Sequence, residues 1–347
     1  MNEINLSSRV VKPSAMTQTE IALWEQLSSK HAELASPFLS FHYVYAVEKT
    51  GANVRVCILE NQNQICGFFP FQFKNWMWKI LKSAIPVGGQ MTDYFGLIAP
   101  TSLRITPLQL LTLARLNHIN FSHLDEHQLT YGLTGEQPRI GLRIPCREIS
   151  PSDRSVGIFN KKQSSEVHRR EKLLIEEIGP IRFTFNQLIN RPSNLRQLIE
   201  QKRRQYARTG VPDALADSWK IKLLEQLLCT ESPACTGLLS ELYAGDQWIA
   251  SHFGIMGNGI LQYWFPVYNP SMAKYSPGRL LLKYIYSMAI QHQVHTIDRG
   301  EGTSHGKNEI RSEEHLFYRG AWYNNAPSAF IVRSFQSLVW RLNTKKL

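Results

Sequence analysis

Cysteine is scarce in this chain, and its five residues are scattered. None is paired as C-x-x-C, which argues against a zinc knuckle, and the odd number argues against a disulfide framework. The sequence also lacks H-E-x-x-H, G-x-S-x-G and any histidine spacing typical of a metal site. Metalloprotease and serine-hydrolase chemistry are therefore disfavoured. We predict reduced, structural thiols and no bound metal.

Long apolar runs are absent too. No segment offers about 18 uninterrupted apolar residues, and the opening MNEINLSSRV has no basic stretch followed by an apolar one. We expect a soluble, cytoplasmic protein, with peripheral contact to the inner face of a membrane left open. Residues 75–83, NWMWKILKS, mix tryptophan with lysine in the manner of interfacial segments. Packing of this segment on its own domain is the other interpretation.

What the chain does have is enough apolar sequence for two cores. At 347 residues it exceeds the usual size of one domain, and a hydrophobic fraction of 43% is ordinary for a globular protein. The formal charge of +11 indicates a surface that attracts anions. These include the phosphates of a co-substrate, an acidic carrier protein, nucleic acid and lipid head groups, and charge alone does not choose among them.

Periodicity predicts a mixed α/β architecture. Residues 53–74 predict a hairpin, residues 91–100 a strand, and residues 107–117 a helix. Helices follow at 161–179, 195–206 and 218–229, and residues 236–268 predict a three-strand meander with an Asn258-Gly259 turn. A helix at 278–291 precedes a strand at 295–300. Both halves read as a hairpin followed by helix and strand, which favours a degenerate duplication.

The junction at 268–282, YNPSMAKYSPGRLLL, has two compatible interpretations. As plain structure, Ser276 caps a helix and Pro277 takes its first position. As a site, the amides at this helix start receive a phosphate, because Gly278 removes a side chain. Lys274 and Arg279 would reinforce such a site.

A second polar cluster follows the next strand, at residues 298–307, DRGEGTSHGK. Its acidic and basic side chains could supply acid or base groups, and a solvated loop is the alternative. The glycine spacing matches neither a dinucleotide-binding fingerprint nor a Walker loop. The basic runs at 168–172 and 201–208 could bind nucleic acid, but such runs are more often solvated helix faces.

The ordered pair YSPGRLLL and DRGEG resembles the CelD-like branch of the GNAT acetyltransferase superfamily, which is related to the FemABX transferases. SPFLSFHYVYA, DYFGLI and VHRREKLLIEEIGPIRF in the first half look like landmarks of the same branch. The chain departs from the branch at a Tyr-Lys pair, where it has Gly306-Lys307, with His305 one position earlier. This puts a tyrosine role at that point in doubt.

The resemblance implies two tandem GNAT-like domains, each a mixed, mostly antiparallel sheet flanked by helices: residues 1–180 on the acceptor side and 181–347 holding the acyl donor. It implies an acyl-CoA or acyl-carrier-protein co-substrate, and no covalently bound cofactor. Glu301 or His305 would be the base, Asp298 an orienting carboxylate and Lys307 a substrate contact. The donor would bind at Tyr275, Ser276, Pro277, Gly278, Arg279 and Leu280, and the acceptor at Asp93, Tyr94, Trp264 and Tyr268.

From this we expect an acyltransferase that acylates an amine or hydroxyl of a sugar-like acceptor, in polysaccharide or cell-surface glycan synthesis. The glycan context comes only from the resemblance. Two alternatives stay open. One is a FemABX-like transferase that uses aminoacyl-tRNA, which the positive charge suits. The other is a non-catalytic basic binding module on the same fold.

Overall fold

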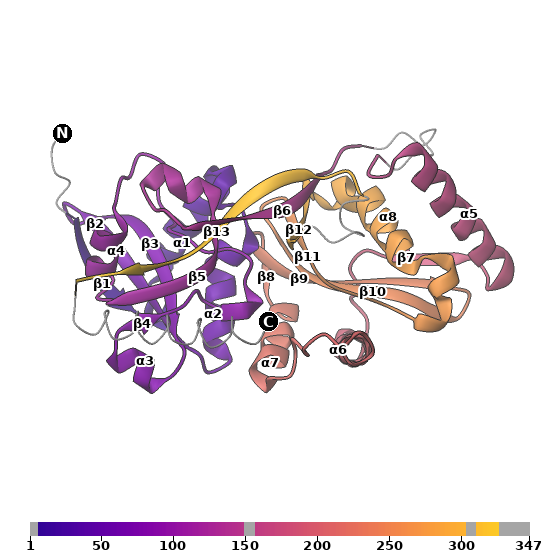
Figure 1. Cartoon of the computed structure of the whole chain (residues 1–347), viewed down its shortest axis with the longest axis horizontal. Helices are drawn as coiled ribbons and strands as arrows, with labels where there is room; N and C mark the ends of the chain where they lie inside the picture. Colours follow the sequence, from indigo (N-terminus) through magenta and orange to yellow (C-terminus); the bar gives the residue numbers. More distant parts are fainter. Residues whose placement is uncertain (1–5, 149–156, 303–309, 326–347) are drawn as a thin grey trace, which may run out of the picture. The chain divides into compact units, whose positions relative to one another are not determined.

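The computed structural model describes residues 6–148, 157–302 and 310–325 (Figure 1). The chain forms two compact units, Met1–Arg139 with Leu316–Leu347, and Ile140–His315. Strands β6 (Gln137–Pro145) and β13 (Glu313–Tyr323) each begin in one unit and end in the other. This division differs from the ranges 1–180 and 181–347, whose acceptor and donor roles remain a proposal.

The first unit contains an antiparallel sheet of β1 (Leu6–Val11), β2 (Asn53–Asn61) and β3 (Gln64–Phe73). A second group of strands comprises β4 (Ser83–Ala84), β5 (His118–Asp125) and the end of β13. Its helices are α1 (Gln18–Lys30), α2 (Phe41–Lys49), α3 (Trp76–Ile80) and α4 (Pro107–Leu113). The β2–β3 hairpin confirms the expectation for residues 53–74, and Gln62 and Asn63 take the left-handed conformation at its turn.

Aromatic rings fill the core of this unit. Phe95 packs against Phe69 and Phe121 with ring centroids 5.6 and 5.3 Å apart, and Trp322 lies 4.8 Å from Phe121. The expected strand at 91–100 is wrong: the segment makes only isolated bridges, at Phe95 and Ile98. Its apolar side chains are buried in this core instead of alternating across a sheet, which explains why the pattern misled.

The second unit is built on one continuous sheet. Its strand order is β6, β12 (Thr296–Glu301), β11 (Ile260–Tyr268), β10 (Gln247–Gly257), β9 (Cys235–Ala244) and β7 (Ile181–Thr184), with β8 (Glu231–Ser232) on β9. The pairs are antiparallel except β11 with β12, which are parallel. Asn258 and Gly259 take the positive φ that the β10–β11 turn requires, as expected.

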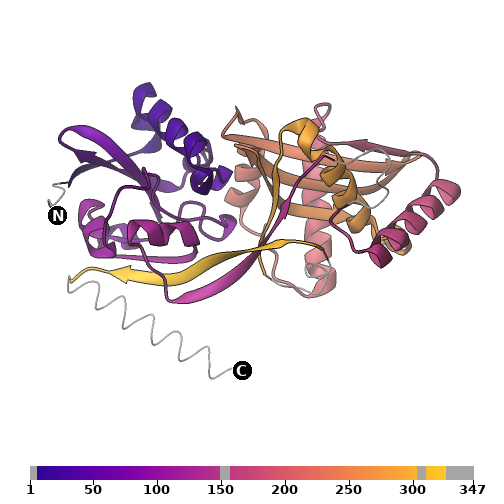
Figure 2. The ribbon, with the colours of Figure 1, turned by 90° about the horizontal axis from the view of Figure 1, so that it is seen from above.

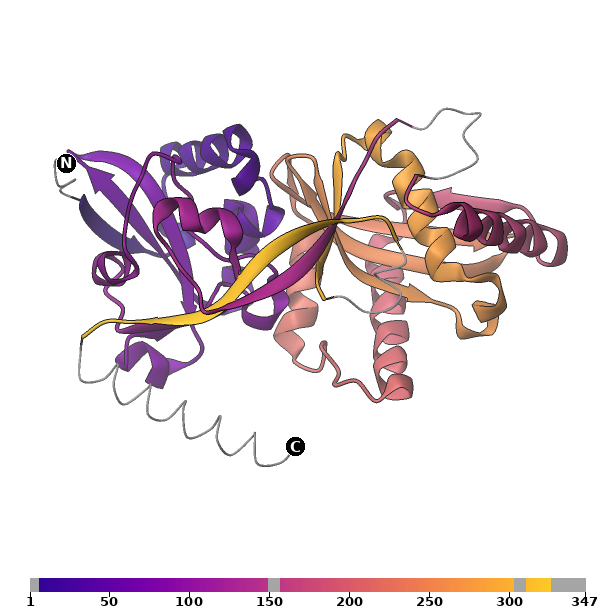
Figure 3. The same ribbon diagram turned by 45° about the horizontal axis from the view of Figure 1, so that its top comes forward.

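Helices cover both faces of this sheet. α5 (Lys161–Glu177) and α8 (Pro277–Ala289) lie across one face, and α6 (Arg191–Thr209) and α7 (Ser218–Leu228) lie on the other (Figures 1, 2 and 3). α8 buries Leu281, Ile285 and Ala289, which recur every four residues and so form one stripe. The predicted fold class, mixed sheets flanked by helices, is confirmed. Among the residues that the structure describes, no helix is both long and apolar enough to cross a membrane.

Candidate functional site

The parallel pair at the centre of the second sheet separates soon after it forms. β11 pairs with β12 only from Ile260 to Gln262, opposite Thr296 to Asp298, yet β11 continues to Tyr268. Beyond Gln262 the two strands no longer pair. The edge of β11 that faces β12 is therefore open to the space between the two strands. Such an opening beside the carboxyl ends of parallel strands is where ligands bind in α/β sheets.

A β-bulge marks the point of separation. The β10–β11 register shifts between Phe253 and Ile255, and the backbone N–H of Trp264 donates to Nε2 of His252 at 3.2 Å. His252 is completely buried, and burial lowers its pKa to about 3, so the ring is neutral and can accept this bond. A side chain on Gly254 would meet the carbonyl oxygen of Gln262 at 2.2 Å. Glycine is therefore required for the close approach of the strands at the bulge.

Sequence reasoning also missed Lys202, which supports the bulge from the face of the sheet that α6 covers. Lys202 is buried on the apolar stripe of α6, although it belongs to the basic run at 201–208. Its ammonium donates to the carbonyl of Pro266 on β11 at 2.9 Å, and burial lowers its pKa to about 8. The helical period placed Lys202 with Leu195 and Ile199, which is the signal that could have identified it.

Helix α8 begins close to where expected, but its cap is different. Ser276 precedes the helix in the left-handed conformation (φ 56°), and its side chain makes no capping bond, which corrects the sequence-based expectation. Its carbonyl instead accepts from the amides of Arg279 and Leu280, at 3.0 and 3.2 Å. A left-handed residue turns its side chain away from the first turn, so the hydroxyl cannot reach the amides that a cap would bind. Pro277 takes the first turn as predicted.

Only part of the expected donor-binding set is accessible. Tyr275, Pro277 and Leu280 are buried, so their side chains serve the core. Gly278 is exposed, and, apart from its chain neighbours and the backbone of its own helix, no heavy atom of the described residues lies within 4 Å of the position that its Cβ would occupy. The helix start therefore leaves space at Gly278 that packing does not use.

Helix α5 contacts the loop that leads into this helix start. Glu177 accepts from the ammonium of Lys274 and from the hydroxyl of Tyr275, at 2.5 and 2.6 Å. These hydrogen bonds lower the pKa of Glu177 and raise that of Lys274. Arg170 donates to the carbonyl of Lys274. Lys274 therefore holds the loop against α5, and its charge is partly offset before any ligand arrives.

The acid cluster at the end of β12 is partly structural. Asp298 is buried, accepts from Nε of Arg143 at 3.2 Å, and accepts from the amide of Gly300 at 2.8 Å. A guanidinium nitrogen of Arg143 also lies 3.1 Å from Nε2 of His315. Glu301, three residues on, is half-buried at the end of the strand. His305 and Lys307 lie outside the described residues.

The expected acceptor residues divide between the units. In the second unit Trp264 is half-buried beside Phe265, and Tyr268 lines a pocket of about 400 Å³ with Arg204, Arg208 and Trp248. The residues that line this pocket include no acid, and the Arg208 guanidinium lies 6.0 Å from the Tyr268 ring centroid. This is a basic, aromatic pocket on the α6 face.

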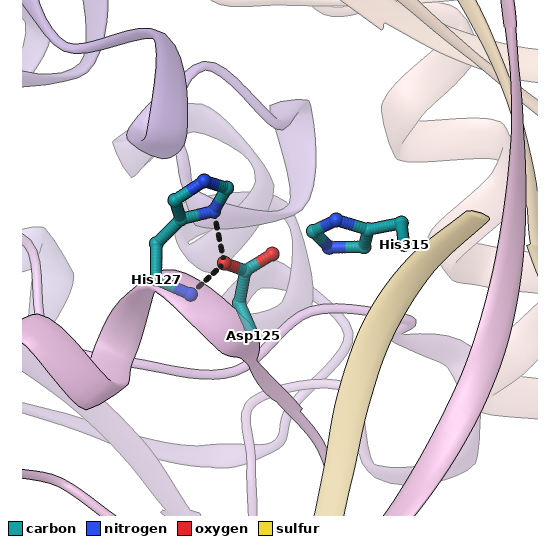
Figure 4. A group of neighbouring side chains, drawn as sticks. All are labelled: Asp125, His127 and His315. Atoms are coloured by element: carbon teal, nitrogen blue, oxygen red, sulfur yellow. Dashed lines mark hydrogen bonds and ion pairs between the residues drawn. The ribbon is translucent and has the colours of Figure 1, made fainter. Parts of the chain in front are cut away.

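Asp93 and Tyr94 lie in the first unit. Asp93 faces His123 at 3.8 Å, whereas Tyr94 is buried with its ring against Phe317, centroids 5.0 Å apart. Sequence reasoning missed a neighbouring acid–imidazole pair at the end of β5. There buried Asp125 accepts from both the backbone N–H and Nδ1 of His127 at 2.9 Å (Figure 4).

Comparison with known proteins agrees with this geometry. Residues 161–308 match the family model of the acetyltransferase (GNAT) domain. None of the curated proteins has a matching sequence. Among solved structures, FemX is similar over 90% of this chain and 96% of that chain, with 10% identity and a TM-score of 0.58.

Two further structures share the fold. One is the C-terminal domain of an Agrobacterium fabrum protein described as a lysylphosphatidylglycerol synthetase (9% identity, 92% and 96% coverage, TM-score 0.53). The other is a Bacteroides thetaiotaomicron protein of unknown function (8% identity, 88% and 98% coverage, TM-score 0.52). At these identities the likeness is one of fold alone. The separated parallel strands and the helix start at Gly278 thus lie within the part of the chain that matches the acetyltransferase (GNAT) domain.

Proposed function

We propose that the protein is an acyltransferase that moves an acyl group from acyl-CoA to an amine or hydroxyl of a sugar-like acceptor, in the synthesis of a polysaccharide or cell-surface glycan. GNAT domains use acyl-CoA as their co-substrate. The observation that carries the proposal is the opening between β11 and β12 beside the unobstructed helix start at Gly278. An acyl carrier protein remains the alternative source of the thioester.

The donor site follows from these two features. The amides of the first turn of α8 and the positive end of its dipole would hold the pyrophosphate, and Gly278 would allow close approach. The thioester arm would lie along the edge of β11 where pairing with β12 has ended. The bulge held by His252 and Trp264 would set the position of the reacting carbonyl.

The chemistry requires a proton acceptor and no covalent enzyme intermediate. A base takes a proton from the acceptor amine or hydroxyl as it attacks the thioester carbon, the carbon–sulfur bond breaks, and the leaving thiolate takes up a proton to give free thiol. Glu301 is our candidate for the base, and His305, outside the described residues, is the second candidate. Asp298 would orient the end of β12 through its bonds to Arg143 and Gly300, and Lys307 would contact substrate.

The acceptor would approach β11 from the α6 face, because the donor arm and α8 occupy the other. The pocket of Arg208, Trp248 and Tyr268 lies on that face and combines aromatic rings with guanidinium groups. Rings of this kind pack on sugar faces, and guanidinium groups bind carboxylate or phosphate. Asp93 and Tyr94 remain proposed acceptor contacts from the first unit.

A thioester screen tests the proposal. The full chain is incubated with a panel of acyl-CoA donors and amine or hydroxyl sugars, and free thiol and acylated product are measured by mass spectrometry. We expect acceptor-dependent thiol release that disappears in Glu301→Gln. Aminoacyl-tRNA is included as a donor, because acylation from tRNA without coenzyme A binding would replace this proposal with the FemABX-like alternative. Absence of turnover with every donor, together with absence of coenzyme A binding, would leave only the non-catalytic alternative.

A further inference from the structure

The first unit exposes a compact apolar surface on α3. The side chains of Trp76, Met77 and Ile80 are 70%, 51% and 69% exposed. Single exposed apolar residues are ordinary, but three large ones within one short helix are not. Within residues 75–83, Trp78 and Leu81 are half-buried and Ser83 is buried, whereas these three side chains are largely exposed among the described residues.

The backbone under these side chains is firmly held. Phe73, at the end of β3, and Ser83, in β4, are buried on either side of α3, and Asn75 caps the helix through the amide of Trp78 at 3.1 Å. Asn117 donates to the carbonyl of Leu81 from its side chain and to that of Lys82 from its backbone. The backbone of α3 is therefore held in place by the rest of the unit, and ordering it on a partner would cost little conformational entropy.

The charged side chains within α3 and beside it in the sequence are of one sign. Lys74, Lys79 and Lys82 are all exposed, and no acidic residue occurs between Glu60 and Asp93. A tryptophan and other apolar side chains interspersed in sequence with exposed lysines suit the boundary of an anionic bilayer, where apolar groups enter the acyl region and ammonium groups reach the head groups. Residues 326–347 carry four basic residues and no acid, so they offer these lysines no charge complementarity.

We propose that α3 docks the protein on anionic lipid bilayers, with Trp76, Met77 and Ile80 inserted at the interface and the three lysines on the head groups. This activity is independent of acyl transfer. It would place the enzyme beside acceptors that are attached to, or made at, a membrane surface.

The test is co-sedimentation of the full chain with vesicles of phosphatidylcholine containing about one-third phosphatidylglycerol, compared with pure phosphatidylcholine. We expect binding to the anionic vesicles that weakens with salt and a blue shift of tryptophan fluorescence. Changing Trp76, Met77 and Ile80 together to serine should reduce the partition coefficient at least about tenfold. Changing the three lysines to glutamine should reduce it about 100-fold at low salt.

The second unit offers a matched control. Leu188 and Ile189 are adjacent, 70% and 71% exposed, and distant in sequence from α3. Changing both to serine also removes large exposed apolar side chains and should leave vesicle binding unchanged. The melting temperature of the α3 variant should also be unchanged, because the replaced side chains are exposed.

Three results would overturn the proposal. The first is equal binding by the α3 variant and the wild type. The second is concentration-dependent self-association in sedimentation velocity that the α3 variant abolishes, since the surface would then join two copies of the chain. The third is a large fall in melting temperature for the α3 variant, which would mean that another segment of the chain covers the helix.

Discussion

Replacing Gly278 with aspartate should separate stability from donor binding. The residue is exposed at the second position of α8, its φ is not positive, and the described residues outside its own helix and chain neighbours leave room for a Cβ. Aspartate is favourable in the first turn of a helix because its charge complements the dipole, and glycine is unfavourable in a helix. The substitution should therefore be neutral or stabilising by up to about 1 kcal/mol.

Donor binding should respond in the opposite direction. In the proposed complex the new carboxylate would lie about 6 Å from a phosphate charge, which at an effective dielectric constant of about 20 to 40 costs about 1.4 to 2.8 kcal/mol. That cost corresponds to coenzyme A affinity reduced about 10- to 100-fold. The loss should shrink at high salt, since the site is open to solvent.

Calorimetric titration with coenzyme A and thermal unfolding measure the two effects in the same preparations. Gly278→Ala is the matched control: it fills the same space without charge and should bind the donor more tightly than Gly278→Asp. If Gly278→Asp binds coenzyme A as well as the wild type does, the phosphate does not lie at this helix start and the reasoning is refuted. If its melting temperature collapses, the statement that packing does not use this space is wrong.

Three further predictions concern the rest of the fold. Glu301→Gln should lower turnover about 100-fold or more while leaving coenzyme A affinity intact, and unaltered turnover would shift the base to His305. Arg143→Ala should cost about 3 kcal/mol of unfolding free energy, because it removes the hydrogen-bonded contact of the Arg143 guanidinium with the buried carboxylate of Asp298, and a change below about 1 kcal/mol in denaturant titration would contradict this. Burial lowers the pKa of His118 from 6.5 to about 4, so its neutral ring stabilises the fold above pH 6.5, and about 3 kcal/mol should be lost as the pH falls toward 4. A His118→Gln variant with the same slope of stability against pH would place that dependence elsewhere.

Much of the second unit was predictable because its signals are local. Asn258-Gly259 fixes a turn by backbone conformation, and the four-residue spacing of Leu281, Ile285 and Ala289 fixes the buried face of α8. Pro277 likewise marks the helix start in the sequence itself. Local rules act within a few residues, so one sequence suffices to read them.

What the sequence could not supply depends on contacts between distant segments. The pairing of Asp298 with Arg143 and the support of β11 by Lys202 join residues that are far apart in the chain. The capping expectation for Ser276 failed because Ser276 also ends a 3₁₀ turn, η6 (Pro270–Tyr275), as its C-cap in the left-handed region. Burial likewise depends on distant contacts. The side chain of Tyr275, one of the expected donor-binding residues, is buried and cannot touch a ligand.

Hydrogen–deuterium exchange of the full chain, with and without saturating coenzyme A, tests the central claim most directly. If the donor lies between β11 and β12 with its pyrophosphate at the start of α8, protection should concentrate in peptides that cover residues 260–282. The peptides of α6 that carry Arg204 and Arg208 should change little with coenzyme A alone. Saturable binding with protection centred on α6 or on the first unit, and none in residues 260–282, would contradict the account.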